Sequence, residues 1–362
     1  MKHLYTVTLF LFFIASLYLF LVGIHSLSDA LTLLNHPFAQ SLFNEIKNPF
    51  VGFFVGILVT AIMQSSSATN ALAITMVSTQ TISLEQVIPI IMGANIGTTV
   101  TNTLVAISTI FRTSDFKRAF AASTVHDFFN IITATILFPL EIYFHIIQKL
   151  SLLLYHILLN NNIQLSTEFK SPIKVGIEQT TKLFSSTFST QPALYALFSI
   201  ALIFLTITLI IKILKFSFLQ TMKQSLHKDI FTSPLRSWSI GAFFTSIVQS
   251  SSITTSLVIP LASEGVLTLE QIYPYTVGAN MGTGVTTFIA ALSLNRVAFV
   301  AAIATLCFDI IGSCVIYPMP IIGDLPLWLS KKFAIISSKY KIIPIIYLLV
   351  LFILFPLMII FF

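Results

Sequence analysis

The sequence predicts an all-α polytopic membrane protein with two inverted-topology repeats, each containing a re-entrant helical hairpin and a broken transmembrane helix. Two observations predict this fold. The composition is 56% hydrophobic and 9% charged, with a mean hydropathy of +0.94, whereas about 25% of the residues in a soluble domain are charged. In addition, one polar motif pattern occurs twice at a constant spacing. A soluble core cannot hide so much apolar surface, so we expect lipid to surround most of the chain.

Several apolar runs are long enough to cross the hydrocarbon core of a bilayer, which requires roughly 20 residues of helix. Basic residues precede the first run, as in a signal peptide, but the run is long and no convincing cleavage site follows it. We expect this run to be retained as a helix. The expected spans are 4–24, 119–140, 193–211, 297–317 and 342–362.

The formal net charge of +6 does not indicate nucleic-acid binding, because the basic residues form no continuous stripe with aromatic residues. They lie in short connections, which the positive-inside rule assigns to the cytoplasm. The N-terminus, with Lys2 and His3, is expected on the same side, and the loop over 160–190 outside. The basic connections contain Arg112, Lys117 and Arg118; Lys212, Lys215, Lys223, Lys228 and Arg236; and Lys331, Lys332, Lys339 and Lys341.

One stretch of the chain occurs twice. Residues 61–107 align without gaps with residues 246–292 at an offset of 185, and most of the shared residues are polar, glycine or proline. Chance similarity between apolar helices would instead share Leu, Ile and Val. An odd number of expected crossings separates the copies, which predicts opposite orientations in the membrane. The connections at 112–118 and 295–296 are therefore expected on opposite sides.

Each copy contains two polar motifs. Two apolar segments too short to span the membrane flank QSSS, at 64–67 and 249–252, which predicts a re-entrant hairpin with QSSS at its tip. The next helix contains GAN-x-GT in the first copy, at 93–98, and in the second, at 278–283, and we expect it to be broken there. Gly-rich backbone at membrane depth is tolerated only where it is buried in protein or lines a cavity.

These elements predict five segments of the chain. Residues 1–40 form an N-terminal transmembrane helix, and residues 41–145 form repeat 1 with its hairpin, its broken helix and a further helix. Residues 146–230 contain the external loop, a connecting helix and a basic cytoplasmic loop. Residues 231–322 form repeat 2, and residues 323–362 form a C-terminal loop and transmembrane helix.

The hairpin tips provide donors for an anion. Amides at a half-helix N-terminus are unsatisfied and carry the positive end of the helix dipole, and serine hydroxyls add donors. Phosphate, with several acceptor oxygens, suits two such tips facing each other. Serines in membrane helices often only bond to a carbonyl, but two copies of QSSS at one distance before GAN favour a binding site. The candidates are Gln64, Ser65, Ser66, Ser67, Gln249, Ser250, Ser251 and Ser252, whereas Ser330 is expected at the surface.

The GAN-x-GT segments offer Asn, Thr and exposed carbonyl oxygens. These hard ligands suit a weakly held monovalent cation such as sodium, and the motifs contain no Arg or Lys to hold an anion alone. Adjacent anion and cation sites would each strengthen binding at the other, which is the basis of coupling. No His, Cys or carboxylate cluster has the spacing of a transition-metal site.

Asp127 lies inside an apolar helix, and an intramembrane carboxylate indicates a functional role by default. The alternative is an internal cap or a partner for an Arg or for His126, which is as well explained by helix packing as by ligand binding. Alignment of the copies at an offset of 179 places Asn130 opposite Asp309 and Asp127 opposite Leu306. Asp127 therefore breaks the symmetry of the repeat, and Asp309 is equally consistent with a functional and a structural role.

Together, these motifs resemble the type II sodium-phosphate cotransporter family. The resemblance covers about residues 50–347, without most of the external loop. The paired QSSS and GAN-x-GT motifs are specific, and VHDFFN adds to that specificity. The matching segments are QSSSAT from Gln64, IPIIMGANIGTTVTNT from Ile88, DFKRAFAASTVHDFFN from Asp115, VQSSS around Gln249 and YPYTVGANMGTG from Tyr273.

The resemblance implies sodium-coupled import of inorganic phosphate by alternating access, with phosphate between the two QSSS tips. In that family, an acid at the position of Asp127 marks electrogenic members that bind an additional sodium ion, so divalent hydrogen phosphate is the expected substrate. Two departures lower the expected strength of the sodium site in the second copy: Gly284 stands where the first copy has Thr99, and Ala279 where relatives often carry a hydroxyl. The other implied sodium ligands are Asn95, Thr98, Thr101, Asn280, Thr283 and Thr286.

The expected protein is not an enzyme and has no cofactor other than sodium as coupling ion. Its expected partners are phosphate, sodium and the lipid bilayer of a bacterial inner membrane. The alternatives are a sodium-coupled carrier of another small oxyanion and a passive anion channel, which would need neither Asp127 nor paired cation ligands. A membrane hydrolase is disfavoured, since no His lies near either QSSS and neither forms a nucleophile elbow.

Overall fold

The computed structural model describes residues 2–33, 48–158, 172–203, 205–206, 209, 213, 231–292 and 294–361. Over these residues the regular elements are α-helices and two π-helical turns, with no β-strand, as the predicted all-α class requires. The first half contains α1 (Lys2–Leu33), α3 (Pro49–Met63), α4 (Ser66–Ser78), α5 (Leu84–Gly97), α6 (Val100–Ile107), α7 (Thr113–Phe144), α8 (Ile146–Leu158), α9 (Pro172–Thr187) and an apolar helix at Pro192–Ile203. The second half contains α11 (Pro234–Val248), α12 (Ser251–Ser256), α13 (Val258–Ser263), α14 (Leu269–Leu292), α15 (Arg296–Ile311), η2 (Gly312–Ile316), α16 (Leu325–Lys339), α17 (Ile343–Leu349), η3 (Val350–Leu354) and α18 (Phe355–Phe361).

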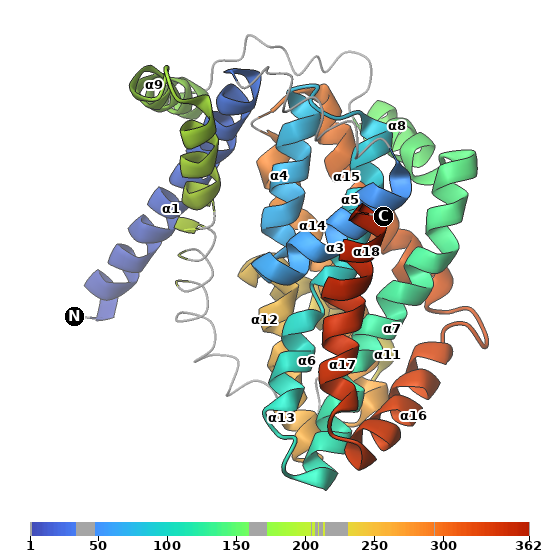
Figure 1. Ribbon diagram of the computed structural model, residues 1–362. Coiled ribbons are helices and arrows are strands. Elements are labelled where there is room, and N and C mark those ends of the chain that lie inside the picture. Colours follow the sequence, from blue (N-terminus) through green and yellow to red (C-terminus); the bar gives the residue numbers. More distant parts are fainter. Residues whose placement is uncertain are drawn as a thin grey trace.

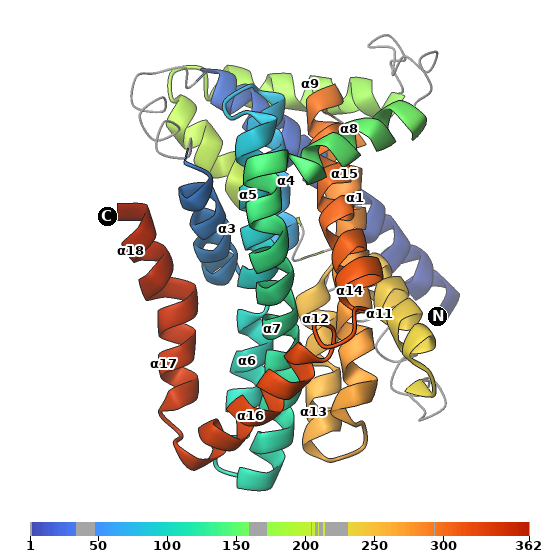
Figure 2. The ribbon, with the colours of Figure 1, turned by 90° about the vertical axis from the view of Figure 1, so that its right-hand side faces the viewer.

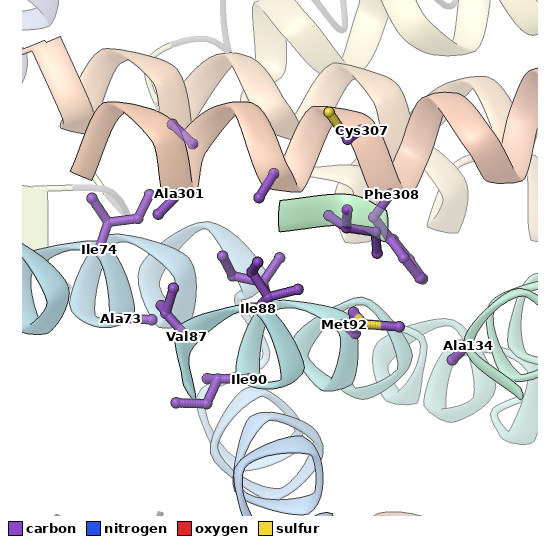
Figure 3. Close-up of a cluster of buried hydrophobic side chains, with 14 of the residues drawn as sticks. Ala73, Ile74, Val87, Ile88, Ile90, Met92, Ala134, Ala301, Cys307 and Phe308 are labelled. Atoms are coloured by element: carbon purple, nitrogen blue, oxygen red, sulfur yellow. The ribbon is translucent and has the colours of Figure 1, made fainter. Parts of the chain in front are cut away.

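The central helices α4, α5, α7, α14 and α15 form an upright bundle, with α8 and α9 lying across one end (Figure 2). Figure 3 shows part of its apolar core, in which Ile74 of α4 and Ile88 and Met92 of α5 face Ala301 and Phe308 of α15. In the described part of the chain, four helical spans are long and apolar enough to cross a membrane: Leu84–Ile107, Thr113–Phe144, Arg296–Ile316 and Ile343–Phe361.

Elements separated by 185 residues have matching bounds. α3 and α11 begin and end at equivalent positions, as do α4 and the pair α12 and α13, and α14 begins where α5 begins and ends where α6 ends. α3 and α11 each end at a glutamine in the left-handed region, Gln64 with φ 52° and Gln249 with φ 54°. The two aligned stretches therefore have closely similar backbones.

Glycines bring α3 against α5 and α11 against α14. A Cβ on Gly93 would lie 1.9 Å from the carbonyl oxygen of Phe53, and a Cβ on Gly278 would lie 2.0 Å from that of Trp238. Another glycine in each of α3 and α11 makes a contact of the same kind with the facing helix. Backbone therefore packs directly on backbone at these crossings, and only glycine leaves the necessary space.

In the first copy, the predicted break in the GAN-x-GT helix is only a turn at which Thr98 and Thr99 keep right-handed helical dihedral angles. Thr98 and Thr99 separate α5 from α6, but α14 continues without interruption, so the break expected at 278–283 is wrong. The glycines of this segment have a different effect. Gly282, for example, lies so close to the α11 backbone that a Cβ would be 2.6 Å from the carbonyl oxygen of Ala242. These glycines allow close helix packing while the helix stays wound.

Part of the expected C-terminal loop is a helix, α16, which packs on α7. Two lysines interrupt its apolar residues, so the sequence has no long apolar run at this place. Ser330 of α16 is buried and donates to the carbonyl oxygen of Leu327, so the expectation of a surface position is wrong. The Asn-rich part of the external loop, 160–162, and most of the basic connection at 212–228 lie outside the described residues.

Gly93→Ala and Gly278→Ala are expected to lower thermal stability, because each added methyl would overlap a carbonyl oxygen and force two helices apart. Overpacking of this kind costs about 1–3 kcal/mol. Gly52→Ala is the matched control, since the nearest atom to its added Cβ would be 3.5 Å away. The unfolding midpoint of the purified chain in detergent measures the effect. Equal midpoints for the three variants would contradict the packing of backbone on backbone.

Candidate functional site

Both QSSS motifs form the same turn between two helices. Gln64 and Gln249 are left-handed, which redirects the chain, and the next residues, Ser65 and Ser250, are extended and cap the following helix. Each capping hydroxyl accepts from the backbone amide three residues later, at 3.3 Å in the first motif and 3.4 Å in the second. The serine cap satisfies one free amide at the helix start, and the first two helical amides remain without a partner in their own helix.

The two tips meet inside the protein. The hydroxyl of Ser67 donates to the carbonyl oxygen of Gln249 at 3.1 Å, and the hydroxyl of Ser252 donates to the carbonyl oxygen of Thr98 at 3.3 Å. Residues of the second tip therefore contact both the first tip and the turn between α5 and α6. The inner serines of both motifs, Ser66, Ser67, Ser251 and Ser252, are only 2% to 5% exposed.

A chain of hydrogen bonds connects the two GAN segments through α7. Asn130 of α7 donates from Nδ2 to the backbone carbonyl of Asn95 at 2.8 Å, and its Oδ1 accepts from Nδ2 of Asn280 at 2.6 Å. His126, one turn earlier on α7, contacts Oδ1 of Asn280 through Nε2, also at 2.6 Å. Asn95 and Asn280, both predicted from the sequence, are thus brought together by a residue that the sequence analysis did not assign to the site.

The same chain continues from His126 to the second hairpin. Nδ1 of His126 lies 3.3 Å from Nδ2 of Asn102 in α6. Oδ1 of Asn102 accepts from the hydroxyls of Thr255 and Ser256 in α12, at 2.9 and 3.0 Å. Asn102 lies in the quoted GAN segment, but an asparagine among apolar residues gave no sign of a partner 153 positions away.

One backbone carbonyl fixes the direction of the hydrogen bonds from Asn95 as far as Nε2 of His126. The carbonyl of Asn95 can only accept, so Asn130 presents its Nδ2 to it and its Oδ1 to Asn280. Asn280 then presents Oδ1 to His126, whose Nε2 must carry the hydrogen. Nδ1 of His126 lies against Nδ2 of Asn102, and the direction of this contact depends on the tautomer of the imidazole.

Asp127 is fully buried beside this chain. Its Oδ2 accepts from the hydroxyls of Tyr347 at 2.8 Å and Thr103 at 3.3 Å, whereas its Oδ1 has no hydrogen-bond partner. Neither an Arg nor a Lys pairs with it among the described residues. Tyr347 was missed by sequence analysis, because a tyrosine 220 positions away in an apolar run gives no sign of this contact.

The remaining predicted sodium ligands form two groups. Thr98 and Thr283 donate to a carbonyl of their own helix, at 2.9 and 3.4 Å. Thr101 and Thr286 have buried hydroxyl oxygens without a hydrogen-bond partner. Leaving a buried hydroxyl unpaired costs about 1–3 kcal/mol. Among the threonines predicted as sodium ligands, Thr101 and Thr286 are therefore the two whose hydroxyl oxygens have no protein partner.

The two aligned halves differ at the position of Asp127. Its counterpart is Leu306, and a Cβ on Gly284 would lie 2.3 Å from Cδ2 of this leucine. Gly284 in turn stands where the first half has Thr99. In the second half a leucine thus takes the place of the carboxylate, and the missing side chain of Gly284 leaves room for it. A carboxylate like that of Asp127 is therefore not repeated at this position.

The polar atoms that could hold an ion at this centre are oxygen atoms of amides, hydroxyls, carbonyls and one carboxylate. No group of three or more His, Cys, Asp or Glu side chains suited to a metal ion occurs in the part of the chain that the structure describes. Such a donor set suits a hard, weakly held cation, and the adjacent serine tips suit an anion.

Comparison with known proteins defines the class. The profile of the Na+/Pi-cotransporter family matches residues 19–212 and 202–316, and the chain belongs to this family. This confirms the resemblance seen in the motifs. Together with its apolar helices, family membership identifies the chain as an integral membrane protein.

Individual relatives are sodium-dependent phosphate transport proteins. The chain is 32% identical to protein 2A of Mus musculus, over 95% of this chain and 66% of the relative, and 31% identical to protein 2B of Homo sapiens, over 94% and 63%. The chain thus spans about two thirds of the length of these relatives. No solved structure is a significant match to it.

Asn130→Asp is expected to destabilise the protein by about 1–3 kcal/mol or more, because it replaces the donor to the Asn95 carbonyl with a second acceptor. Thr135→Val, at an exposed position on the same helix, is the matched control. Thermal unfolding in detergent measures both variants. If Asn130→Asp and the unmodified protein unfold at the same midpoint, the stability of the protein does not depend on the direction of these hydrogen bonds.

Proposed function

We propose that this chain is a sodium-coupled importer of inorganic phosphate that holds its substrate between the two QSSS tips. The observation that carries the proposal is the hydrogen bond between Ser67 of the first tip and the carbonyl of Gln249 in the second. Two motifs far apart in the sequence thereby present serine hydroxyls to one buried place. The family and the names of the mammalian relatives support sodium and phosphate as the transported ions.

Neutral donors and co-bound cations hold the phosphate in this proposal. Helix α4 has 13 residues, so the free amides and the dipole at its N-terminus favour an anion. Helix α12 has six residues and contributes mainly its hydroxyls. The phosphate charge is balanced by sodium ions at the neighbouring oxygen ligands, and each ion strengthens binding of the other by the same factor. This mutual dependence couples the sodium gradient to phosphate uptake.

We also propose that the two copies are inverted repeats, each with a re-entrant hairpin, and that they move relative to each other in alternating access. The matching helix bounds support this. So do two contacts at equivalent helix ends: Arg118 donates to the carbonyl of Ser263 at the end of α13, and Asn295 donates to the carbonyl of Ser78 at the end of α4. The end of α13 lies at the bottom of Figure 1 and the end of α4 at the top.

A cavity of about 690 Å³ lies at the end of the bundle where α7 begins. Lys117, Arg118 and Lys331 line it together with Glu270, which pairs with Lys331 at 2.6 Å. In the proposed orientation, with the N-terminus in the cytoplasm of a bacterial cell, this end faces inward. The excess of positive charge there gives a released phosphate ion a favourable passage.

Ser66→Ala and Ser251→Ala are each expected to weaken the apparent affinity for phosphate about tenfold, because a hydrogen bond to a charged group contributes about 1.5–3 kcal/mol. Ser65 and Ser250 are less suitable positions, since both cap helices. Uptake of radiolabelled phosphate into proteoliposomes measures the affinity, with Ser186→Ala in an exposed part of α9 as the control. Unchanged affinity in either tip variant would exclude a site made by both tips. Full uptake without a sodium gradient would indicate a passive channel.

Asp127→Gly is expected to retain sodium-dependent uptake but to lose its acceleration by an inside-negative potential. Two sodium ions with divalent phosphate move no net charge, whereas a third sodium at Asp127 adds one. That charge contributes about 2.3 kcal/mol per 100 mV to accumulation. Uptake with and without a valinomycin-clamped potential measures the effect.

The unmodified chain and Tyr347→Phe, which keeps the carboxylate but removes one donor to it, serve as controls in this experiment. The Tyr347→Phe variant is expected to remain voltage-dependent with weaker sodium affinity. An active Asp127→Gly protein with the full voltage response would contradict the assignment of the third sodium ion. A uniformly inactive, misfolded variant would indicate a structural role for Asp127.

A further inference from the structure

A second carboxylate lies in the interior, at Asp309 of α15, and the transport cycle proposed above does not use it. This residue is 3% exposed, and neither of its carboxylate oxygens has a hydrogen-bond partner. A buried, ionised carboxylate without a partner is strongly unfavourable, so it requires either a proton or a cation.

Two hydroxyls without a hydrogen-bond partner lie on α7 and η2, which pack against each other close to Asp309. Gly312 follows Asp309 by one turn on the same face of the helix, and a Cβ on Gly312 would lie 3.1 Å from Cγ2 and 3.6 Å from Oγ1 of Thr133 in α7. Ser313 lies four residues after Asp309 and shares this face. The hydroxyl oxygens of Thr133 and Ser313 are both buried without a partner. Because Gly312 has no side chain, α7 approaches η2 closely at the turn that follows Asp309.

Comparison with Asn130 explains why the carboxylate lacks a partner. The alignment at an offset of 179 places Asp309 opposite Asn130 and Gly312 opposite Thr133, so the two helices cross at equivalent residues. Asn130 uses its amide hydrogens to donate to a backbone carbonyl. An ionised Asp309 has no hydrogen to donate, so it cannot make the equivalent bond. A cation between facing oxygens would replace the missing donor.

We propose that Asp309, Thr133 and Ser313 form a monovalent-cation site where α7 packs on η2, the continuation of α15, taking sodium as a further coupling ion. The inference rests on the proposed sodium-coupled function. One carboxylate and neutral hydroxyls supply hard oxygen ligands and a single negative charge, which one sodium ion balances and a divalent ion would exceed. The π-helical turn η2 begins at Gly312, and such turns occur frequently at functional sites.

The test counts sodium ions bound to the full chain in detergent, with radioactive sodium and no phosphate. Asp309→Asn is expected to bind one sodium ion fewer at saturation, because the amide removes the charge but keeps the shape. Thr133→Val is expected to weaken one class of bound sodium about tenfold. Thr135→Val, exposed on the same helix, is the matched control and is expected to bind sodium like the unmodified chain.

Equal sodium counts for Asp309→Asn and the unmodified chain would overturn the proposal. A change in the pH dependence of thermal unfolding without a change in the sodium count would also overturn it and would identify Asp309 as a protonated structural group. If Asp309→Asn fails to fold, unchanged sodium affinity in Thr133→Val overturns the site.

Failure of the proposed function gives a different result. In that case the unmodified chain shows no sodium-dependent phosphate uptake, whatever the sodium count of the Asp309→Asn protein. Combining Asp127→Asn with Asp309→Asn tests whether the two carboxylates bind separate ions. The double variant is expected to bind two sodium ions fewer than the unmodified chain. A double variant that loses only one would place both carboxylates at a single ion and overturn the separate site.

Discussion

The single acceptor at the carbonyl of Asn95 constrains the whole centre of this protein. From it, a directional chain of hydrogen bonds passes through Asn130, Asn280 and His126 to Asn102 and the second hairpin. The amides of Asn130 and Asn280 each have one orientation, and Nε2 of His126 carries a hydrogen. Helices from both aligned stretches are therefore joined by hydrogen bonds between buried polar side chains. Phosphate and sodium, as proposed, bind beside this chain.

The sequence predicts the residues of the polar centre better than it predicts the tertiary contacts between them. The repeated QSSS and GAN-x-GT motifs identified Ser67, Gln249 and Asn280, because polar residues repeated within apolar segments rarely arise from lipid-facing helices. Tyr347 was missed because its contact with Asp127 spans most of the chain and only the tertiary fold creates it. The unbroken α14 was also missed, since a glycine-rich pattern fits either an unwound helix or a closely packed one.

The two halves share a backbone but differ in polar content. Asp127 in the first half corresponds to Leu306 in the second, while Asn130 corresponds to Asp309. The fold therefore brings equivalent positions into equivalent places, and single side chains decide what each place can bind. The carboxylates of the centre, one in each half, occupy positions that are not equivalent to each other.

The glycine crossings have a mechanical consequence. Where Gly93 meets the carbonyl of Phe53 and Gly278 that of Trp238, neighbouring helices cannot slide without a collision of backbone atoms. α3 and α5 therefore form one rigid pair of helices, and α11 and α14 form another. Between these two pairs of helices lie asparagine, histidine and serine side chains, which are joined by hydrogen bonds and not by direct packing of backbone on backbone. In the proposed alternating-access cycle, movement between the halves would be concentrated at these side chains, beside the proposed ligands.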